Sequence, residues 1–292
     1  MPMKRHAIRQ PGWFRTGASF LLAPLLFGLT AATAVAAQFS NCEVSGTRGS
    51  VKLETVVPGA LSVRPVLPAP GWWNGDSPET INGGFEYCMA ANMAYRAGLD
   101  RVIVVSRSFA QILTGQAKGF DIALSEITIT DERKKAVNFT DPYFDSDMGV
   151  LVRAGDKITA ENIKTKRLGV KQGTTTHQFL EDHVKPTQPL KVYPEVAAMY
   201  AALAAGQVDA VVYDTPNVLA RAKQSEGRFE VVGRYDTGER WGGLVNKDSP
   251  NMAVFNKLIQ EMKDDGTFDR LAAQYLAPSL GMDPNKVPIF KP

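Results

Sequence analysis

The sequence predicts an α/β protein in which mainly parallel sheets are flanked by helices. Short apolar runs of strand length alternate along the chain with segments of helical spacing, an order typical of βαβ units. Glycine, proline and hydroxyl residues stand where the helices are expected to begin and end. The chain has 292 residues, 44% apolar and 22% charged, enough for two domains of ordinary size with a sizeable core.

In the first half of the chain, runs of apolar and β-branched residues predict strands, and longer segments with Ala, Met and Leu at helical spacing predict helices. Residues 38–57, rich in small and polar residues, are interpreted as an extended lead-in. The predicted strands are 61–66, 102–106 and 120–124, and the predicted helices are 85–97 and 110–117.

In the second half, several helix ends are well marked. Pro216 and Pro250 each follow a hydroxyl residue, as at the start of a helix, Gly266 stands just beyond a predicted helix end, and Thr267 can cap the last helix. The predicted strands are 149–153, 168–171, 190–193, 208–213, 229–232 and 243–246, and the predicted helices are 176–184, 195–205, 216–223, 250–264 and 268–275.

The first 37 residues have the composition of a secretory signal peptide. Four basic residues precede an apolar stretch from Ala18 to Leu29, and small residues follow as far as Ala37. A membrane anchor is the alternative, which Pro24 and Gly28 weaken. Removing this segment leaves 29 basic and 30 acidic side chains, so nothing basic remains that would indicate a nucleic-acid partner.

Two cysteines, Cys42 and Cys88, remain after the predicted cleavage. Export to an oxidising compartment makes a disulfide between them plausible, and closing a loop of this size would stabilise the fold by roughly 4 kcal/mol. Two unpaired, buried thiols are the alternative. Neither cysteine has the spacing of a zinc site, and the sequence indicates no metal or other cofactor.

The segment 120–144, FDIALSEITITDERKKAVNFTDPYF, is the most informative of the chain. An apolar run is followed by the hydroxyls of Thr128 and Thr130 and then by Arg133. Arginine offers a rigid bidentate fork for a carboxylate, and ligands of α/β sheets collect beyond the carboxyl ends of the strands. A solvated turn in which Arg133 pairs with Asp131 or Asp141 is the alternative.

Two strand-to-helix junctions lie further along the chain. At the first, GVKQGTT, the strand turns through Gly173 into a helix whose first N–H groups attract anions. At the second, VDAVVYDTP, a buried strand ends at Asp214, directly before a helix. Asp214 is therefore a candidate for binding a cation, with helix capping as the structural alternative.

Together these segments resemble the amino-acid-binding family of periplasmic solute-binding proteins, which serve ABC importers. The motifs EITITDERKKAVNFTDPYF, GVKQGTTTHQFL, VDAVVYDTPNVLA and DDGTFDRLAAQYL carry the resemblance, with Gly83-Gly84-Phe85-Glu86 at the predicted first long helix. The resemblance implies a two-lobed type II periplasmic binding protein fold. Each lobe would be a mainly parallel sheet flanked by helices, and two crossover strands would form the hinge. Lobe 1 would comprise 58–147 plus 238–292, and lobe 2 would comprise 148–237.

The resemblance also implies roles for individual residues. Arg133 would bind the α-carboxylate of an amino acid, helped by Thr128 and by the backbone N–H groups of Thr174 and Thr175. Asp214 would bind the α-ammonium group. These residues come from different lobes, so that ligand binding would close the cleft. The expected partners are a small amino-acid-like ligand and the membrane permease, the expected state is a monomer, and the expected location is the periplasm.

Three further residues are expected at the cleft. Lys171 could contact a ligand side chain, Phe109 and the pair Trp72-Trp73 could form aromatic walls, and Trp73 is the member of the pair expected to contact the ligand. Lobe packing is the alternative for the tryptophan pair, Trp72 and Trp73, and a surface position is the alternative for Lys171.

Glu126 departs from the family pattern, which favours a small residue there. It is two residues from Thr128, so that both side chains face the same way in extended backbone. It could bind an additional positive group or the ammonium itself, or it could pair with Arg133. A second departure is the absence of an acidic residue after the first strand until Asp76.

Two other function classes stay open at this point. No GxSxG, Walker or GxGxxG motif is present, so we expect no enzyme. A periplasmic dehydratase of the same fold, acting on prephenate-like or arogenate-like acids with Glu126 as general acid, is the enzymatic alternative. A sensor that reports ligand occupancy to a separate membrane receptor is the third class.

Overall fold

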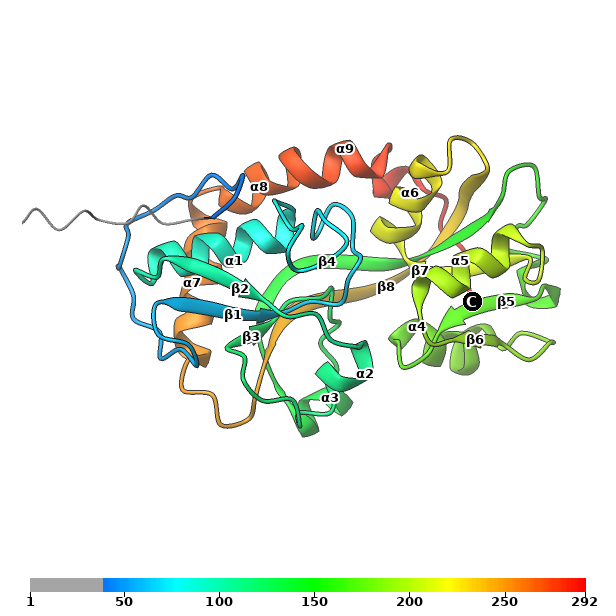
Figure 1. Ribbon diagram of the computed structural model, residues 1–292. Coiled ribbons are helices and arrows are strands. Elements are labelled where there is room, and N and C mark those ends of the chain that lie inside the picture. The colour runs from blue at the N-terminus through cyan, green and yellow to red at the C-terminus, as the bar shows by residue number, and fades with distance from the viewer. Residues whose placement is uncertain (1–38) are drawn as a thin grey trace, which may run out of the picture. The chain divides into compact units, whose positions relative to one another are not determined.

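The computed structural model describes residues 39–292, shown in Figure 1. The predicted signal peptide, 1–37, lies outside these residues. Within them the chain forms an eight-stranded sheet covered by helices, which confirms the predicted α/β class. The strands are β1 (Ala60–Arg64), β2 (Arg101–Val104), β3 (Ile122–Ala123), β4 (Asn138–Arg153), β5 (Leu168–Lys171), β6 (Lys191–Tyr193), β7 (Ala210–Asp214) and β8 (Phe229–Val245).

The helices are mostly short, and α1 and α7 are the longest. None of the helices within residues 39–292 has the length and apolar character that crossing a bilayer requires. The helices are α1 (Phe85–Arg96), α2 (Phe109–Leu113), α3 (Asp131–Ala136), η1 (Ile163–Thr165), α4 (Thr175–Phe179), η2 (Leu180–Val184), α5 (Val196–Ala204), α6 (Thr215–Gln224), α7 (Met252–Asp264), α8 (Thr267–Leu271), η3 (Ala272–Leu276), α9 (Ala277–Leu280) and η4 (Pro284–Lys286).

Two long antiparallel strands, β4 and β8, connect the two halves of the sheet. The strand order is β2-β1-β3-β8-β4-β7-β5-β6. β1 is parallel to β2 and β3, and β5 is parallel to β6 and β7. β4 and β8 pair from Asn138↔Val245 to Arg153↔Phe229, with register shifts that include one between Ser146 and Met148. Such irregularities bend and twist a strand pair, so the two halves are joined by two bent crossover strands.

We call the half that contains β1–β3 and α1–α3 lobe 1, and the half that contains β5–β7 and α4–α6 lobe 2. Lobe 1 has a core around α1, where Phe85 and Met89 pack against Phe255 of α7. Lobe 2 has apolar clusters around Val150 of β4 and Val211 of β7. Each lobe therefore has apolar clusters of its own, formed where helices pack on its part of the sheet.

The C-terminal segment lies against lobe 2, although the sequence assigned it to lobe 1. Helix α9 packs on α6, and Arg234 pairs with Ile289 in a short parallel bridge. Phe290 is buried beside Tyr235. A Cβ atom at Gly233 would collide with the Phe290 ring, so the glycine opens the space that this ring occupies.

Three local expectations differ from the structure. Residues 131–133 were expected as a charged turn but begin the helix α3, because the Thr130 Oγ1 accepts a hydrogen bond from the Arg133 N–H and caps a helix. Helix α7 begins at Met252 after Asn251, not at Pro250. Gly266, with a φ of 70°, is the N-cap of α8 in place of Thr267, which is the first residue of that helix.

The lead-in, described from residue 39 to residue 57, is free of helix and strand and is tied to lobe 1 at several places. A disulfide joins Cys42 to Cys88 of α1, as proposed from the sequence. Further on, the Arg96 side chain donates from Nε to the Ser45 carbonyl (3.1 Å) and from Nη2 to the Ser45 Oγ (3.0 Å).

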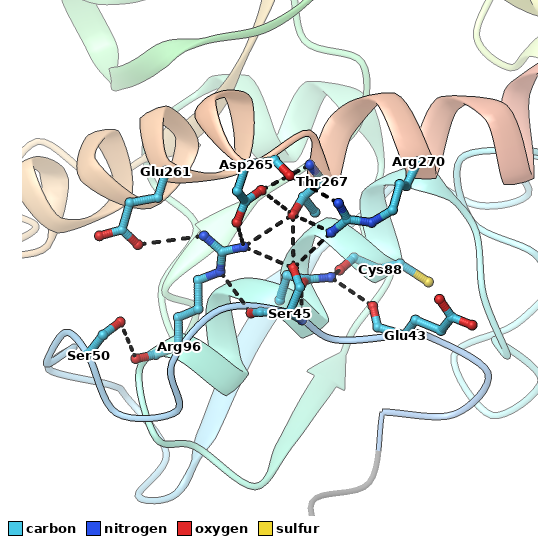
Figure 2. A network of polar contacts seen from close by, with 10 residues as sticks. Glu43, Ser45, Ser50, Cys88, Arg96, Glu261, Asp265, Thr267 and Arg270 are labelled. Atoms are coloured by element: carbon cyan, nitrogen blue, oxygen red, sulfur yellow. Dashed lines mark hydrogen bonds and ion pairs between the residues drawn. The ribbon is translucent and has the colours of Figure 1, made fainter.

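Figure 2 shows the polar network around Arg96. The Arg96 side chain is only 2% exposed, and its Nη2 lies 2.6 Å from the Asp265 Oδ2. Burial alone would raise the pKa of Asp265, but hydrogen bonds from Thr267 and Arg96 lower it below its ordinary value. The network therefore joins the lead-in, α1 and the α7–α8 junction through one buried cation.

Replacing Arg96 with Met is expected to lower the free energy of unfolding by about 2 kcal/mol, because several charge-assisted hydrogen bonds are lost. Urea denaturation monitored by circular dichroism measures the change. Arg48→Met is the matched control, since the Arg48–Asp100 pair is exposed and such pairs contribute about 1 kcal/mol or less. Equal losses for the two variants would contradict the role given to Arg96.

Candidate functional site

A cavity of about 490 Å³ lies between the two lobes. Its lobe 1 wall is formed by the loop 66–72, Phe109 at the start of α2, and Ser125 and Glu126 after β3. Its lobe 2 wall is formed by Lys171 at the end of β5, Tyr213 at the end of β7, and side chains of α5 and α6. Because strand ends from both lobes meet here, the cavity occupies the position at which α/β sheets bind ligands.

The structure places three of the predicted residues, Phe109, Glu126 and Lys171, in the cavity wall. The Nζ of Lys171 lies 4.6 Å from the centre of the Phe109 ring, so these two side chains meet across the lobes. Lys171 is only 3% exposed, which excludes the alternative of a surface lysine. The other predicted residues lie outside this wall.

Arg133 reaches from lobe 1 to lobe 2. Its Nη1 donates to the Thr128 carbonyl (2.7 Å) and its Nη2 to the Gly173 carbonyl (3.3 Å). The guanidinium also lies 5.4 Å from the centre of the Phe109 ring. Burial lowers the pKa of Arg133, and the carboxylates of Glu239 and Asp214 act in the opposite direction. Neither Asp131 nor Asp141 pairs with Arg133, so the solvated-turn interpretation does not describe this side chain.

Asp214 ends β7 and precedes α6, which has Pro216 in its first turn. Its side chain makes no capping hydrogen bond, so the structural alternative of helix capping does not account for it. Burial raises the pKa of Asp214 well above its ordinary value and Glu239 raises it further, while Lys171 and Arg133 lower it. Asp214 and Arg133, which come from different lobes, are thus within electrostatic range of each other.

The hydroxyl residues predicted beside Arg133 meet at a carboxylate that the sequence analysis missed. Glu239 lies on the crossover strand β8 and is 8% exposed. Burial raises its pKa, whereas the hydroxyls of Thr175 and Thr128 and the charge of Arg133 lower it. Thr174 caps α4, with its Oγ1 accepting from the His177 N–H (3.2 Å). The sequence offered no local signal for Glu239, because this residue lies between the predicted strands 229–232 and 243–246, in a segment that the structure shows as part of β8.

Glu126 has an unusual backbone conformation, with a φ of 54°. Its N–H donates to the Glu86 Oε1 (2.8 Å), and this buried partner fixes a conformation that is rare outside glycine, asparagine and aspartate. Burial raises the pKa of Glu126 well above its ordinary value, and Glu86 and Asp214 raise it further. The Oε2 atom is buried without a hydrogen-bond partner.

Trp73 does not line the cavity, contrary to the expectation from the sequence, and Trp72 occupies that place. The Trp73 ring is fully buried, and its Nε1 donates to the Glu86 Oε2 (2.6 Å). Gly84, with a φ of 111°, allows the Trp72 carbonyl to approach the start of α1, where a Cβ atom would collide with it. Trp72 faces the cavity and Trp73 is buried away from it. The sequence did not determine which of the two would face the cavity.

The buried Glu86 was recognised in the sequence only as part of a helix-start motif. It accepts hydrogen bonds from Trp73, from the Tyr143 hydroxyl and from the Glu126 backbone. Burial raises its pKa, and these hydrogen bonds lower it. Glu86 does not line the cavity, but it holds the backbone of Glu126, which does. Within residues 39–292 no group of His, Cys, Asp and Glu side chains has the arrangement of a metal site.

Two lobes joined by two crossover strands, with a buried polar cavity between them, define the class of two-lobed type II periplasmic binding proteins. The profile of the bacterial extracellular solute-binding proteins, family 3, matches residues 76–278. The chain belongs to this family, and the resemblance stated from its motifs is confirmed.

Proteins similar to this chain include amino-acid-binding proteins. The L-cystine-binding protein TcyJ of Escherichia coli K12 is 27% identical over 196 residues, which are 66% of this chain and 73% of the relative. The histidine-binding periplasmic protein of the same strain is 29% identical over 206 residues, 66% of this chain and 78% of the relative. An ancestral amino acid-binding protein, a precursor of cyclohexadienyl dehydratase, has a crystal structure that superposes with a TM-score of 0.66 at 28% identity, covering 75% of this chain and 95% of the ancestral protein.

Proposed function

We propose that this chain is the periplasmic solute-binding component of an ABC importer and captures a small amino acid, or a related zwitterion, between its lobes. One observation carries the proposal: the Arg133 guanidinium of lobe 1 reaches the Gly173 carbonyl of lobe 2 beside the ring of Phe109, which lines the cavity, and the charges of Arg133 and Asp214 act on each other's pKa. A guanidinium and a carboxylate held in this way match the two charges of an amino acid. The names of the relatives support the same assignment.

In the proposed complex, the α-carboxylate takes the place of the Gly173 carbonyl at Arg133, with Thr128 and the N–H groups of Thr174 and Thr175 beside it. The 3.3 Å contact from Arg133 to Gly173 is long for a charged hydrogen bond, so exchanging it for a ligand carboxylate is favourable. The α-ammonium group binds Asp214, which is then held as the ionised carboxylate.

Binding would close the two lobes around the ligand, with β4 and β8 as the hinge. The proposed lobes are 58–147 plus 238–276, and 148–237 plus the C-terminal segment 277–292. The first 37 residues would direct export and be removed, and the mature chain would act as a monomer that delivers its ligand to a membrane permease.

The experiment is a thermal-shift screen of the chain without its first 37 residues against the common amino acids, followed by calorimetry on those that stabilise it. A ligand present at 100 times its Kd is expected to stabilise the protein by about 2.7 kcal/mol. One or more amino acids should raise the Tm and bind with one site per chain. If no amino acid did so, the proposed function would be contradicted.

A dehydratase is the second candidate, and the state of Glu126 favours it. A buried carboxyl group with a raised pKa can serve as a general acid, and the ancestral precursor of cyclohexadienyl dehydratase has the same fold. Incubation with prephenate or arogenate, followed by ultraviolet absorbance of the aromatic product, separates the two functions, because a binding protein gives no turnover.

A further inference from the structure

The cavity extends well beyond the residues proposed to hold the ligand's zwitterionic group. Arg133 and Asp214 are not part of its wall, and its volume of about 490 Å³ continues between the loop 66–72 and the helices α5 and α6. The cavity therefore has room for a long ligand side chain.

The lobe 2 wall of the cavity carries buried polar atoms that have no hydrogen-bond partner. They are the Tyr200 hydroxyl on α5, and the Asn217 Oδ1 and the Arg221 Nε on α6. Asn217 and Arg221 are four residues apart, so they lie on the same face of α6. Buried polar groups are almost always hydrogen-bonded in a folded protein, and all three belong to residues that line this cavity. Their unmet hydrogen bonds indicate that a polar ligand group binds here.

The cavity wall carries four charged side chains, those of Glu126, Glu195, Lys171 and Arg221, and the surroundings of its two cations bear on the sign of that group. Lys171 lies among the carboxylates of Glu195, Glu126 and Asp214, each of which offsets the lowering of its pKa by burial. Lys171 is thus already compensated by acidic neighbours.

Arg221 forms no ion pair within residues 39–292. Its guanidinium lies 5.4 Å from the centre of the Tyr200 ring and 5.4 Å from that of the Phe229 ring. These contacts hold the guanidinium in place and leave its charge available to an anion.

We propose that the side chain of the captured amino acid ends in a carboxylate, which Arg221 and the Tyr200 hydroxyl bind at the wall of the cavity formed by α5 and α6. This proposal rests on the proposed function, since it places the α-amino and α-carboxylate groups at Asp214 and Arg133. The ligand class is a long acidic amino acid, or an amino acid extended by a carboxylate-bearing substituent.

Calorimetry with three amino acids of similar length tests the proposal: L-2-aminopimelate with an anionic end, L-norleucine with a neutral end, and L-lysine with a cationic end. The unmodified protein should bind L-2-aminopimelate at least about tenfold more tightly than the other two, as expected for a charged hydrogen bond. Arg221→Gln should lower the affinity for L-2-aminopimelate at least about tenfold and change that for L-norleucine by less than about twofold.

Two further variants make the test specific. Lys164→Gln removes one positive charge from an exposed position of lobe 2, outside the cavity wall, and should leave the preference unchanged. Tyr200→Phe keeps the ring and removes the hydroxyl, and should lower L-2-aminopimelate affinity about threefold. If Arg221→Gln does not fold by circular dichroism, the preference of the unmodified protein and the effect of Tyr200→Phe decide.

The outcomes distinguish this proposal from the proposed function. A preference for L-lysine or L-norleucine, or an equal loss of both L-2-aminopimelate and L-norleucine in Arg221→Gln, would overturn the carboxylate subsite while amino-acid binding stood. The absence of binding by every amino acid, including those of the thermal-shift screen, would overturn both.

Discussion

Replacing Arg133 with Ala is expected to weaken amino-acid binding by about 2–5 kcal/mol, the cost of removing one partner from a buried charged pair. The structural reason is that Arg133 presents its guanidinium between Thr128 of lobe 1 and Gly173 of lobe 2. Isothermal titration calorimetry with the best ligand of the screen measures the loss. Arg133→Lys keeps the charge without the bidentate fork and should recover only part of the affinity.

The control for this prediction is Lys134→Ala. Lys134 is on the same helix, is about half exposed, and pairs only with Asp131, so its replacement should leave the affinity unchanged. Thermal unfolding of each variant without ligand separates a loss of binding from a loss of folding. Unaltered affinity in a folded Arg133→Ala protein would show that the carboxylate of the ligand binds elsewhere.

Replacing Asp214 with Asn is expected to weaken amino-acid binding by about 1.5–3 kcal/mol, the range for hydrogen bonds to charged groups. The effect should be confined to ligands that carry an ammonium group. The 2-hydroxy acid that corresponds to the best amino acid is the matched ligand, and its affinity should hardly change. Calorimetry of both ligands with both proteins completes the cycle, and equal losses for the two ligands would remove the proposed role of Asp214.

The pKa of Asp214 gives this prediction a pH dependence. Burial raises that pKa well above its ordinary value, so the free protein holds a proton on Asp214 at pH values where an ordinary aspartate, with a pKa near 4, is ionised. The ammonium group needs the ionised carboxylate. Affinity should therefore rise with pH through the raised pKa and become constant above it, and binding below it should release a proton. Calorimetry in two buffers of different ionisation enthalpy measures that release, which Asp214→Asn should abolish.

Glu239 adds a competing carboxylate at the same place. It is buried on the crossover strand β8 and lies near Arg133, Thr128 and Thr175. These are the groups proposed to receive the carboxylate of the ligand. The carboxylate of Glu239 thus interacts with the same groups that the ligand carboxylate requires. The ligand must displace Glu239 from these groups or share them with it.

The elements of the fold were predictable where a local signal is strong. Apolar runs located the strands, and the helix-start signals at Thr215-Pro216 and Gly84-Phe85 correspond to α6 and α1. Residues 149–153 and 229–232 were correctly expected as strand, but their continuation into β4 and β8 was not. Exposed polar residues such as Asp145 and Asp236 interrupt the apolar pattern of these two long strands. Hydrophobic periodicity alone therefore does not predict that the strand continues through them.

Among the candidate site residues, the sequence located those whose role follows from their own chemistry. Arg133, Asp214 and Lys171 were found because charged residues next to predicted strand ends are unusual. The sequence did not predict that the cavity wall contains Trp72, Tyr200 and Arg221, or that Glu86 is buried behind it. These positions depend on how α1, α5 and α6 pack.

The amino-acid sequence by itself determined the α/β class, the order of the elements and the positions of the charged groups at strand ends, because these follow from local hydrophobic spacing and residue chemistry. Only the tertiary structure decided which of two adjacent tryptophans faces the cavity, where the C-terminal segment packs, and which side chains of α5 and α6 line the cavity. These depend on contacts between residues far apart in the chain, and burial and charge compensation exist only once the lobes have been assembled.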